Sequence, residues 1–199
     1  VWMDRVTELT NGEVKFDYYP AEQMGKSKDL LSLTQTGVVD VGYVGVSYIA
    51  DKLPLSAVGE LPEAFDTSCM GTNAYWTLAQ PGGLLDQAEL APLKVRMLFV
   101  MVLSPYHVMT ARKEITGADS FKGLKLRTTG GTKEMAVELL GATPISIPAP
   151  ETREALSRGT IDGVLFPHSS VLPYGLESQL KYGTEGINFG SFVASYVIS

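Results

Sequence analysis

The sequence has few of the residues from which disulfide frameworks, metal sites and catalytic triads are built. Cys69 is the only cysteine among 199 residues, so there is no disulfide framework. The two histidines, His107 and His168, stand alone, without zinc-like spacing to a cysteine. No G-x-S-x-G elbow, G-x-x-x-x-G-K-[ST] loop or H-E-x-x-H motif occurs. We therefore expect no cofactor and no enzymatic activity.

Long hydrophobic runs and clustered positive charge are also absent. The longest uninterrupted apolar run, residues 97–103, is far shorter than the ~20 residues of a membrane span, and we interpret it as a buried strand rather than a membrane insertion. The formal net charge is -6 at pH 7, and the basic residues are scattered, which argues against a nucleic-acid surface. An anionic ligand must therefore meet a local positive charge.

What the sequence does contain is the order strand, helix, strand, which occurs twice. The predicted elements are residues 13–20, 27–37 and 38–45, and then residues 143–148, 150–159 and 160–167. Such units are typical of parallel α/β sheets. Both helix-to-strand turns also share a glycine, a β-branched residue and an aspartate. Two lobes with the same strand-helix-strand plan would explain this repeat. The alternative is coincidence, because glycine often caps helices and aspartate favours turns in any protein.

The long β-rich run over residues 93–110 is interrupted at Ser104 and Pro105, which is typical of a crossing between two lobes. We expect an α/β, two-lobed fold resembling periplasmic binding proteins, with an interlobe cleft beside the crossing. Residues 1–101 form lobe I, to which residues 190–199 return, and residues 102–189 form lobe II. The chain opens inside a helical pattern and closes on a strand-like run, so we expect it to be truncated at both ends.

Arg127 is the strongest candidate for a ligand contact. It ends the predicted strand "GLKLR" and precedes a Gly-rich turn and a helix expected from about residue 132 to 140. An arginine beside a helix amino terminus suits a planar carboxylate, because its fork donates two parallel hydrogen bonds and the helix end adds positive potential. The alternatives are a surface arginine and an internal salt bridge.

Further candidates lie at strand ends or in the loops after them, where they could wall a cleft. They are Tyr106, His107, Phe166, Pro167 and His168. The alternative is core packing, which is the favoured interpretation for each of these residues taken singly. Ser104 lies three residues before His107, but no acidic residue is placed to orient that ring, so the pair does not predict a hydrolytic site.

Four stretches together carry a family resemblance over essentially the whole chain. They are "LTNGEVKFDYYPAEQMGKSKDLLSLTQTGVVDVG", "ELPEAF", "FKGLKLRTTGG" and "ELLGATPISIPAPETREALSRGTIDGVLFP". The chain resembles the extracytoplasmic solute-binding proteins of tripartite ATP-independent periplasmic (TRAP) transporters, the DctP-like receptors. Each motif is weak alone, whereas their combination is specific.

The resemblance implies a periplasmic receptor that closes on a small organic acid and delivers it to TRAP membrane permease subunits. It implies that Arg127 is the carboxylate-binding arginine and that Phe192 helps to enclose the ligand. Two departures from the family pattern stand out. His107 occupies the position of a second arginine, and Phe166 replaces an amide. Both favour a less polar ligand with one carboxylate, such as a 2-oxo, aromatic or branched aliphatic acid.

Two other functions remain open at this point. The same lobes could form the sensor domain of a signalling receptor for organic acids. An enzyme acting on a small acid, with His107 or His168 as general base, is the less favoured alternative, because no nucleophile, metal or cofactor motif accompanies either histidine.

Overall fold

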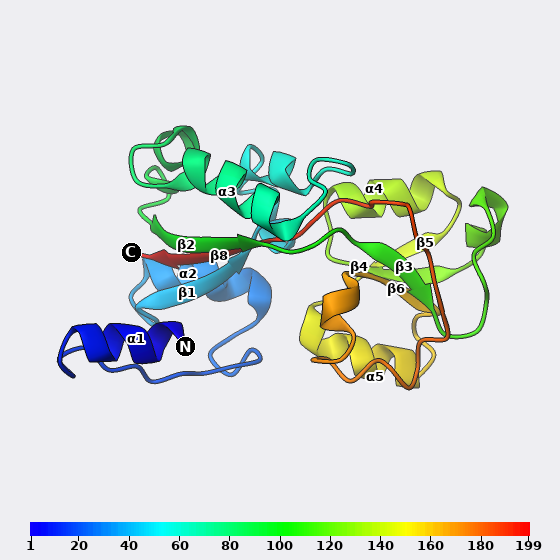
Figure 1. The fold of residues 1–199 in the computed structure, drawn as a ribbon, viewed down its shortest axis with the longest axis horizontal. Coiled ribbons are helices and arrows are strands. Elements are labelled where there is room, and N and C mark those ends of the chain that lie inside the picture. Colours follow the sequence, from blue (N-terminus) through cyan, green and yellow to red (C-terminus); the bar gives the residue numbers. More distant parts are fainter.

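Two α/β lobes stand side by side and are joined by extended segments of the chain (Figure 1). The structure is a computed structural model that describes residues 1–199. Lobe I contains a three-stranded antiparallel sheet in the order β1-β8-β2. Its strands are β1 (Val41–Gly45), β8 (Val193–Ile198) and β2 (Arg96–Val102). The last strand of the chain is therefore the central strand of the first lobe.

The helices of lobe I are α1 (Trp2–Leu9), α2 (Leu30–Gln35) and α3 (Ser68–Ala79). Short helical turns also occur at Ser27–Asp29, Val46–Ile49 and Ser56–Glu60, and a single π-helical turn at Asp86–Leu90. The core lies between the sheet and α2 and α3, and valines of all three strands contribute to it. Because side chains of a strand alternate between its two faces, the valines of β8 at 193 and 197 reach this core, while Tyr196 reaches the opposite face.

Lobe II contains a five-stranded sheet in the order β5-β4-β6-β3-β7. Its strands are β3 (His107–Thr110), β4 (Lys125–Thr128), β5 (Thr143–Ser146), β6 (Gly163–Phe166) and β7 (Tyr182–Gly183). Strand β4 runs parallel to β5 and β6, whereas β3 is antiparallel to β6 and β7. Helices α4 (Thr132–Leu139) and α5 (Thr152–Ser157) lie on opposite sides of this sheet (Figure 1). Short turns occur at Ala118–Phe121, Ala149–Glu151 and His168–Ser170.

The two segments that cross between the lobes are hydrogen-bonded to each other. Leu103 and Tyr106, between β2 and β3, donate backbone hydrogen bonds to the carbonyls of Phe192 and Gly190, at 2.9 and 2.8 Å. Gly190 has φ +91°, and a Cβ there would lie 2.1 Å from the carbonyl oxygen of Glu60. The crossing therefore needs a glycine at this position, and it fits closely against lobe I.

Most of the predicted elements are confirmed, and one is wrong. The second unit forms as β5, α5 and β6, and the break between β2 and β3 falls at residues 103–106. In the first unit, α2 and β1 form, but residues 13–20 form no strand. These residues have no neighbouring strand to supply a hydrogen-bonded ladder, and most of their side chains are exposed. The parallel unit predicted for lobe I is therefore wrong, since all strand pairs in its sheet are antiparallel.

The lobe limits that we derived from the sequence, 1–101 with 190–199 and 102–189, remain our proposal. None of the helices combines the length and apolar character needed to cross a membrane.

Candidate functional site

Arg127 lies on β4, is completely buried and has no carboxylate partner. Its Nε donates a 2.8 Å hydrogen bond to the carbonyl of Ile147, and its Nη1 donates a 3.2 Å hydrogen bond to the carbonyl of Leu165. None of the ion pairs of the structure includes it, and its Nη2 is buried without a hydrogen-bond partner. A buried cation is costly unless an anion compensates it. The arrangement therefore offers a preorganised site for an anion.

The end of β4 carries further unpaired polar groups. The hydroxyls of Thr128 and Thr129, which follow Arg127, are also buried and without partners. Beyond them, Gly130 and Gly131 adopt positive φ values of +97° and +63° and lead directly into α4. Buried polar groups in native proteins are nearly always hydrogen-bonded, so three such groups in consecutive residues indicate a place that receives a polar ligand.

An aromatic stack supports the guanidinium group. The Cζ atom of Arg127 lies 4.5 Å from the centroid of the Phe166 ring, which is a cation–π distance. Tyr174 packs edge-on against the same ring, with centroids 5.5 Å apart. Phe166 is 2% exposed and cannot change its position without disturbing the core of lobe II. The packed rings therefore hold the guanidinium group in place.

Two tyrosines, Tyr48 of lobe I and Tyr106 of the crossing segment, lie near Arg127. Tyr48, in the turn after β1, and Tyr106, in the crossing segment, both have their pKa raised by burial, which Arg127 partly offsets by attracting the phenolate. Both phenolic hydroxyls therefore keep their protons at neutral pH and can donate a hydrogen bond. The Tyr48 hydroxyl also accepts a 3.3 Å hydrogen bond from the backbone N–H of Ala149 in lobe II. It thus lies where the lobes meet.

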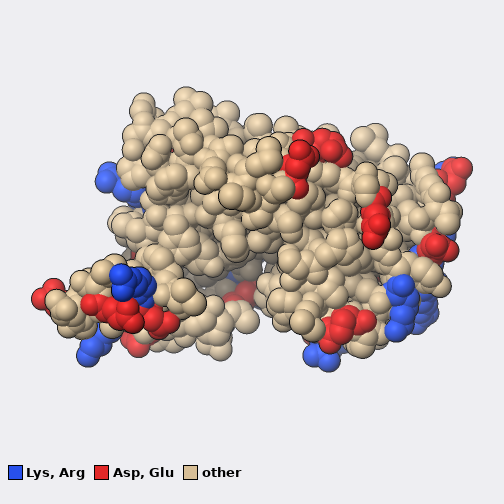
Figure 2. Space-filling view, viewed as in Figure 1, with Lys and Arg blue, Asp and Glu red and all other residues tan.

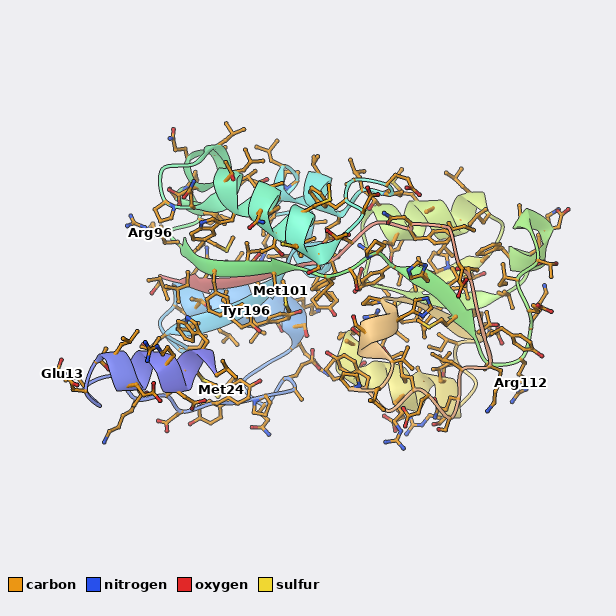
Figure 3. All side chains as sticks on the ribbon, viewed as in Figure 1. Glu13, Met24, Arg96, Met101, Arg112 and Tyr196 are labelled. Atoms are coloured by element: carbon orange, nitrogen blue, oxygen red, sulfur yellow. The ribbon has the colours of Figure 1, made fainter.

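Two more tyrosines extend this cluster over the sheet of lobe I. Burial raises the pKa of Tyr43 on β1 well above its ordinary value, and the neighbouring Tyr48, Tyr106, Tyr174 and Tyr196 raise it further. The rings of Tyr43 and Tyr196 lie 5.4 Å apart. Figure 3 shows Tyr196 and Met101 on the side of the lobe I sheet that faces α1. The cluster provides apolar ring faces together with several hydroxyl groups.

The lobes contact each other on both sides of this cluster. Lys26 of lobe I forms a 2.8 Å ion pair with Glu151 of lobe II, and Glu60 of lobe I pairs with Lys133 of lobe II at 3.3 Å. Figure 2 shows the surface hollowed between the lobes, on the side away from α3 and α4. Tyr48 bonds Ala149 across the contact between the lobes, and Arg127 is its neighbour, so we take this region as the candidate site. Nowhere do three His, Cys, Asp or Glu side chains come together to hold a metal ion.

The residues that we predicted from the sequence divide into two groups. Arg127, Phe166 and Tyr106 lie together at the cleft, with the Tyr106 and Phe166 rings 6.1 Å apart. Phe192 is buried and packs at a tilt against Tyr48, with ring centroids 5.2 Å apart, so it contacts a residue of the candidate site. Pro167 is buried where β6 passes into the next turn.

The two histidines form a pair of their own. Their rings stack at 4.4 Å and 25°, and the Nδ1 of His107 is buried without a partner. In the ladder between β3 and β6, His107 lies opposite Phe166, and β6 separates β3 from β4. Phe166 therefore lies between His107 and Arg127. His107 is thus not next to Arg127, as a second cation that binds the same carboxylate would be. Ser104 contacts Ser169 at 3.3 Å and has no bond to His107, so no hydrolytic pair forms.

His107 should make the folded state sensitive to acid. Burial, and secondly His168, lower its pKa below the ordinary 6.5. The unfolded chain then binds this proton at a higher pH than the folded chain, so the stability contributed by neutral His107 is lost as the pH falls below about 6.5 towards the folded-state value. We expect His107→Gln to reduce the acid-dependent loss of melting temperature between pH 7 and 5. In His168→Gln, ring NMR should show the pKa of His107 moving upward; an unchanged value would contradict this account.

Comparison with known proteins places the whole chain in one group. The pattern of the DctP family, described as "Bacterial extracellular solute-binding protein, family 7", matches residues 1–194. A monocarboxylate 2-oxoacid-binding periplasmic protein of Nostoc sp. is 32% identical over 169 residues, which cover 79% of this chain and 43% of that protein. Other relatives are named for binding 2,3-diketo-L-gulonate and C4-dicarboxylates, each at 27% identity.

Solved structures show the same fold. A TRAP solute-binding protein of Bordetella bronchiseptica with bound (R)- and (S)-mandelate has a TM-score of 0.87 and 30% identity, covering 99% of this chain and 62% of that one. One of Rhodoferax ferrireducens with copurified benzoate has a TM-score of 0.88 and 29% identity, covering 100% and 62%. This chain thus spans about three fifths of these structures and about half the length of the curated relatives it matches.

Proposed function

This chain belongs to the DctP family of bacterial extracellular solute-binding proteins, and from that premise we propose that it is the periplasmic receptor of a TRAP-type transporter. The receptor binds a small organic monocarboxylate in the interlobe cleft, closes over it and delivers it to the membrane permease subunits. The observation that carries the proposal is the buried, unpaired guanidinium of Arg127. A carboxylate there makes a charge-assisted hydrogen bond, which contributes about 1.5–3 kcal/mol net.

The charges around the cleft support a ligand with a single negative charge. Lys133 is compensated by Glu60, and Lys26 by Glu22 and Glu151. Arg127 is the one cation of this region that no acidic side chain compensates. A second carboxylate on the ligand would have to be buried without a cation, which costs several kcal/mol.

The walls of the cleft support a compact body with an apolar face. The partly exposed rings of Tyr43, Tyr48 and Tyr174 offer apolar surface, with the buried Phe166 ring packed behind Tyr174. The hydroxyls of Tyr48 and Tyr106 can donate to an oxo or hydroxy group beside the carboxylate. Aromatic, 2-oxo and branched aliphatic acids all meet this description. The mandelate, benzoate and 2-oxo acids bound by relatives belong to the same chemical range.

A panel of acids tests this proposal. Thermal unfolding is followed with benzoate, mandelate, 4-methyl-2-oxopentanoate, succinate and galacturonate at equal concentrations. At least one of the three monocarboxylates without a sugar body is expected to raise the melting temperature, since a ligand at 100 times its Kd stabilises by roughly 2.7 kcal/mol. Succinate and galacturonate should give no shift. A larger shift with either of them would refute the assignment of a single-charge, apolar cleft.

The enzyme alternative has no support in the cleft. Arg127 and the tyrosines bind and orient an acid, but neither histidine lies beside the anchor, and Ser104 is not bonded to His107. Recovery of unchanged acid after prolonged incubation is the expected result.

A further inference from the structure

The carboxylate of Glu60 connects three parts of the chain at one buried point. Its Oε2 accepts hydrogen bonds from the hydroxyl of Ser47, in lobe I, and from the Nζ of Lys133 on α4 of lobe II, the latter at 3.3 Å. Its Oε1 accepts a 2.8 Å hydrogen bond from the backbone N–H of Val193, where the returning crossing segment enters β8. Lys133 also donates to Ser47 at 3.4 Å. Glu60 thus joins both lobes and the segment between them.

This ion pair is shielded from water. The side chain of Lys133 is 0% exposed and that of Glu60 is 3% exposed. Separating the two groups would leave two buried charges without partners, which is far more costly than breaking an exposed pair. A motion of the lobes that preserves the pair is therefore strongly favoured over one that breaks it.

Backbone contacts at the same point are equally close. Gly130, just before α4, approaches Ser47 so closely that a Cβ would lie 2.9 Å from its carbonyl oxygen. The Thr132 hydroxyl donates to the carbonyl of Glu60 at 3.4 Å, and Gly190 of the crossing segment lies against the same carbonyl. The start of α4 is therefore seated on lobe I without intervening space.

The contacts at the other side of the cleft are of a different kind. Lys26 and Glu151 pair at 2.8 Å, but their side chains are 61% and 46% exposed. An exposed ion pair contributes little and can be replaced by water. The Glu60–Lys133 contact is therefore buried and costly to break, whereas the Lys26–Glu151 contact is exposed and easily broken.

We propose that the Glu60–Lys133 pair is the pivot about which the two lobes rotate when the cleft opens and closes. The inference rests on the proposed function, since it assumes that the lobes move to admit an acid. Lobe II then rotates as one body, and the contacts that separate are the Lys26–Glu151 ion pair and the hydrogen bond from the backbone N–H of Ala149 to Tyr48.

The pivot also positions the ligand site. The Nζ of Lys133 lies 5.1 Å from the centroid of the Tyr106 ring, and Tyr106 in turn lies beside Arg127. Glu60 holds Lys133 in place and so fixes this tyrosine at the anchor. Glu60 and Lys133 are positioning residues, because neither offers a free group to the ligand.

The test measures the distance between the lobes in ligand-free protein. Spin labels are placed on Cys69, the exposed cysteine of α3, and on a cysteine introduced as Ser178→Cys in lobe II. Glu60→Gln leaves Lys133 uncompensated, and we expect a broader distance distribution and a lower melting temperature. The double variant Glu60→Gln/Lys133→Met removes both charges, so its melting temperature should recover while its distribution stays broad.

Glu89→Gln provides the matched control. Glu89 is also a buried carboxylate of lobe I, and it accepts hydrogen bonds from the backbone N–H groups of Leu55 and Ser56 and from the Ser56 hydroxyl, all within its own lobe. Its loss should lower the melting temperature without broadening the distribution. A double variant with a distribution as narrow as that of the unaltered protein would overturn the pivot, and so would a double variant that does not recover stability.

The binding of acids separates this inference from the proposed function. If the pivot is correct, the double variant still binds monocarboxylates, about tenfold more weakly, because fewer molecules hold the lobes in the binding-competent arrangement. Broadened distances together with no acid binding in the unaltered protein would leave the pivot standing and refute the receptor. If the double variant keeps the distance distribution of the unaltered protein, and the unaltered protein binds acids normally, the receptor stands and the pivot is refuted.

Discussion

Replacing Arg127 by methionine is expected to abolish the binding of organic acids. The guanidinium is the one uncompensated cation at the cleft, and its Nη2 is the donor that the protein leaves free. Loss of a charge-assisted hydrogen bond of about 1.5–3 kcal/mol weakens binding roughly 10- to 150-fold. Burial of the ligand carboxylate without a partner adds to this loss. Isothermal titration with the best acid of the panel should therefore show no measurable heat.

Two further variants separate charge from geometry at this position. Arg127→Lys keeps the charge but loses the planar fork and the donors to Ile147 and Leu165, so we expect weak residual binding. Arg112→Met is the control, because Arg112 is an exposed arginine of lobe II that Figure 3 shows far from the gap between the lobes. Its affinity should be unchanged. Normal binding by Arg127→Met would refute the anchor.

Replacing Phe166 by alanine is expected to have the largest effect on stability and a second effect on binding. The ring is 2% exposed and belongs to the α5-side core of lobe II, so its removal costs about 3–5 kcal/mol. It also removes the surface on which the Arg127 guanidinium rests, at 4.5 Å. Urea denaturation should show the first effect, and titration with an acid at low temperature, where the variant is folded, should show weaker binding.

Phe121→Ala is the matched control for Phe166. Phe121 is equally buried in lobe II, at 2% exposure, but belongs to the other core cluster and makes no contact with Arg127. It should lose comparable stability and keep its affinity for the acid. Equal losses of affinity in both variants would mean that Phe166 acts only through the fold.

The placement of Arg127 and Phe166 could be predicted because it depends on local pattern. Alternation within "GLKLR" and "GVLF" fixes which residues face each core, and parallel strands bring their carboxyl ends to one edge. Arg127 lies one residue before the end of β4, and Phe166 ends the neighbouring strand β6, so the two side chains meet. The second strand-helix-strand unit was predictable for the same reason.

The features that the sequence did not predict depend on tertiary partners. The alternation in residues 13–20 suits a strand, but a strand forms only where another offers a ladder. Tyr48 lies in the turn directly after β1, a position like the one that singled out Arg127, so that signal could have found it, whereas Tyr43 lies in the middle of β1 and gave no such signal. Tyr174 gave no such signal, because it lies in an irregular loop and reaches the cleft only through its packing on Phe166.

The ion pair between Glu60 and Lys133 could likewise not be predicted from the sequence, because the two residues are 73 positions apart. His107 was predicted to line the ligand site at the position of a second arginine, and that stays a prediction; the order of strands in the sheet of lobe II places Phe166 between His107 and Arg127.

The central claim is that Arg127 receives the carboxylate of a small acid between the lobes. A crystal structure of the protein with benzoate, or with whichever acid ranks first in the panel, tests it most directly. The account predicts a carboxylate oxygen about 2.7–2.9 Å from the Nη2 of Arg127, with the body of the acid against Phe166 and the tyrosines. An acid bound elsewhere, with the Nη2 of Arg127 bonded to a group of the protein itself, would contradict it.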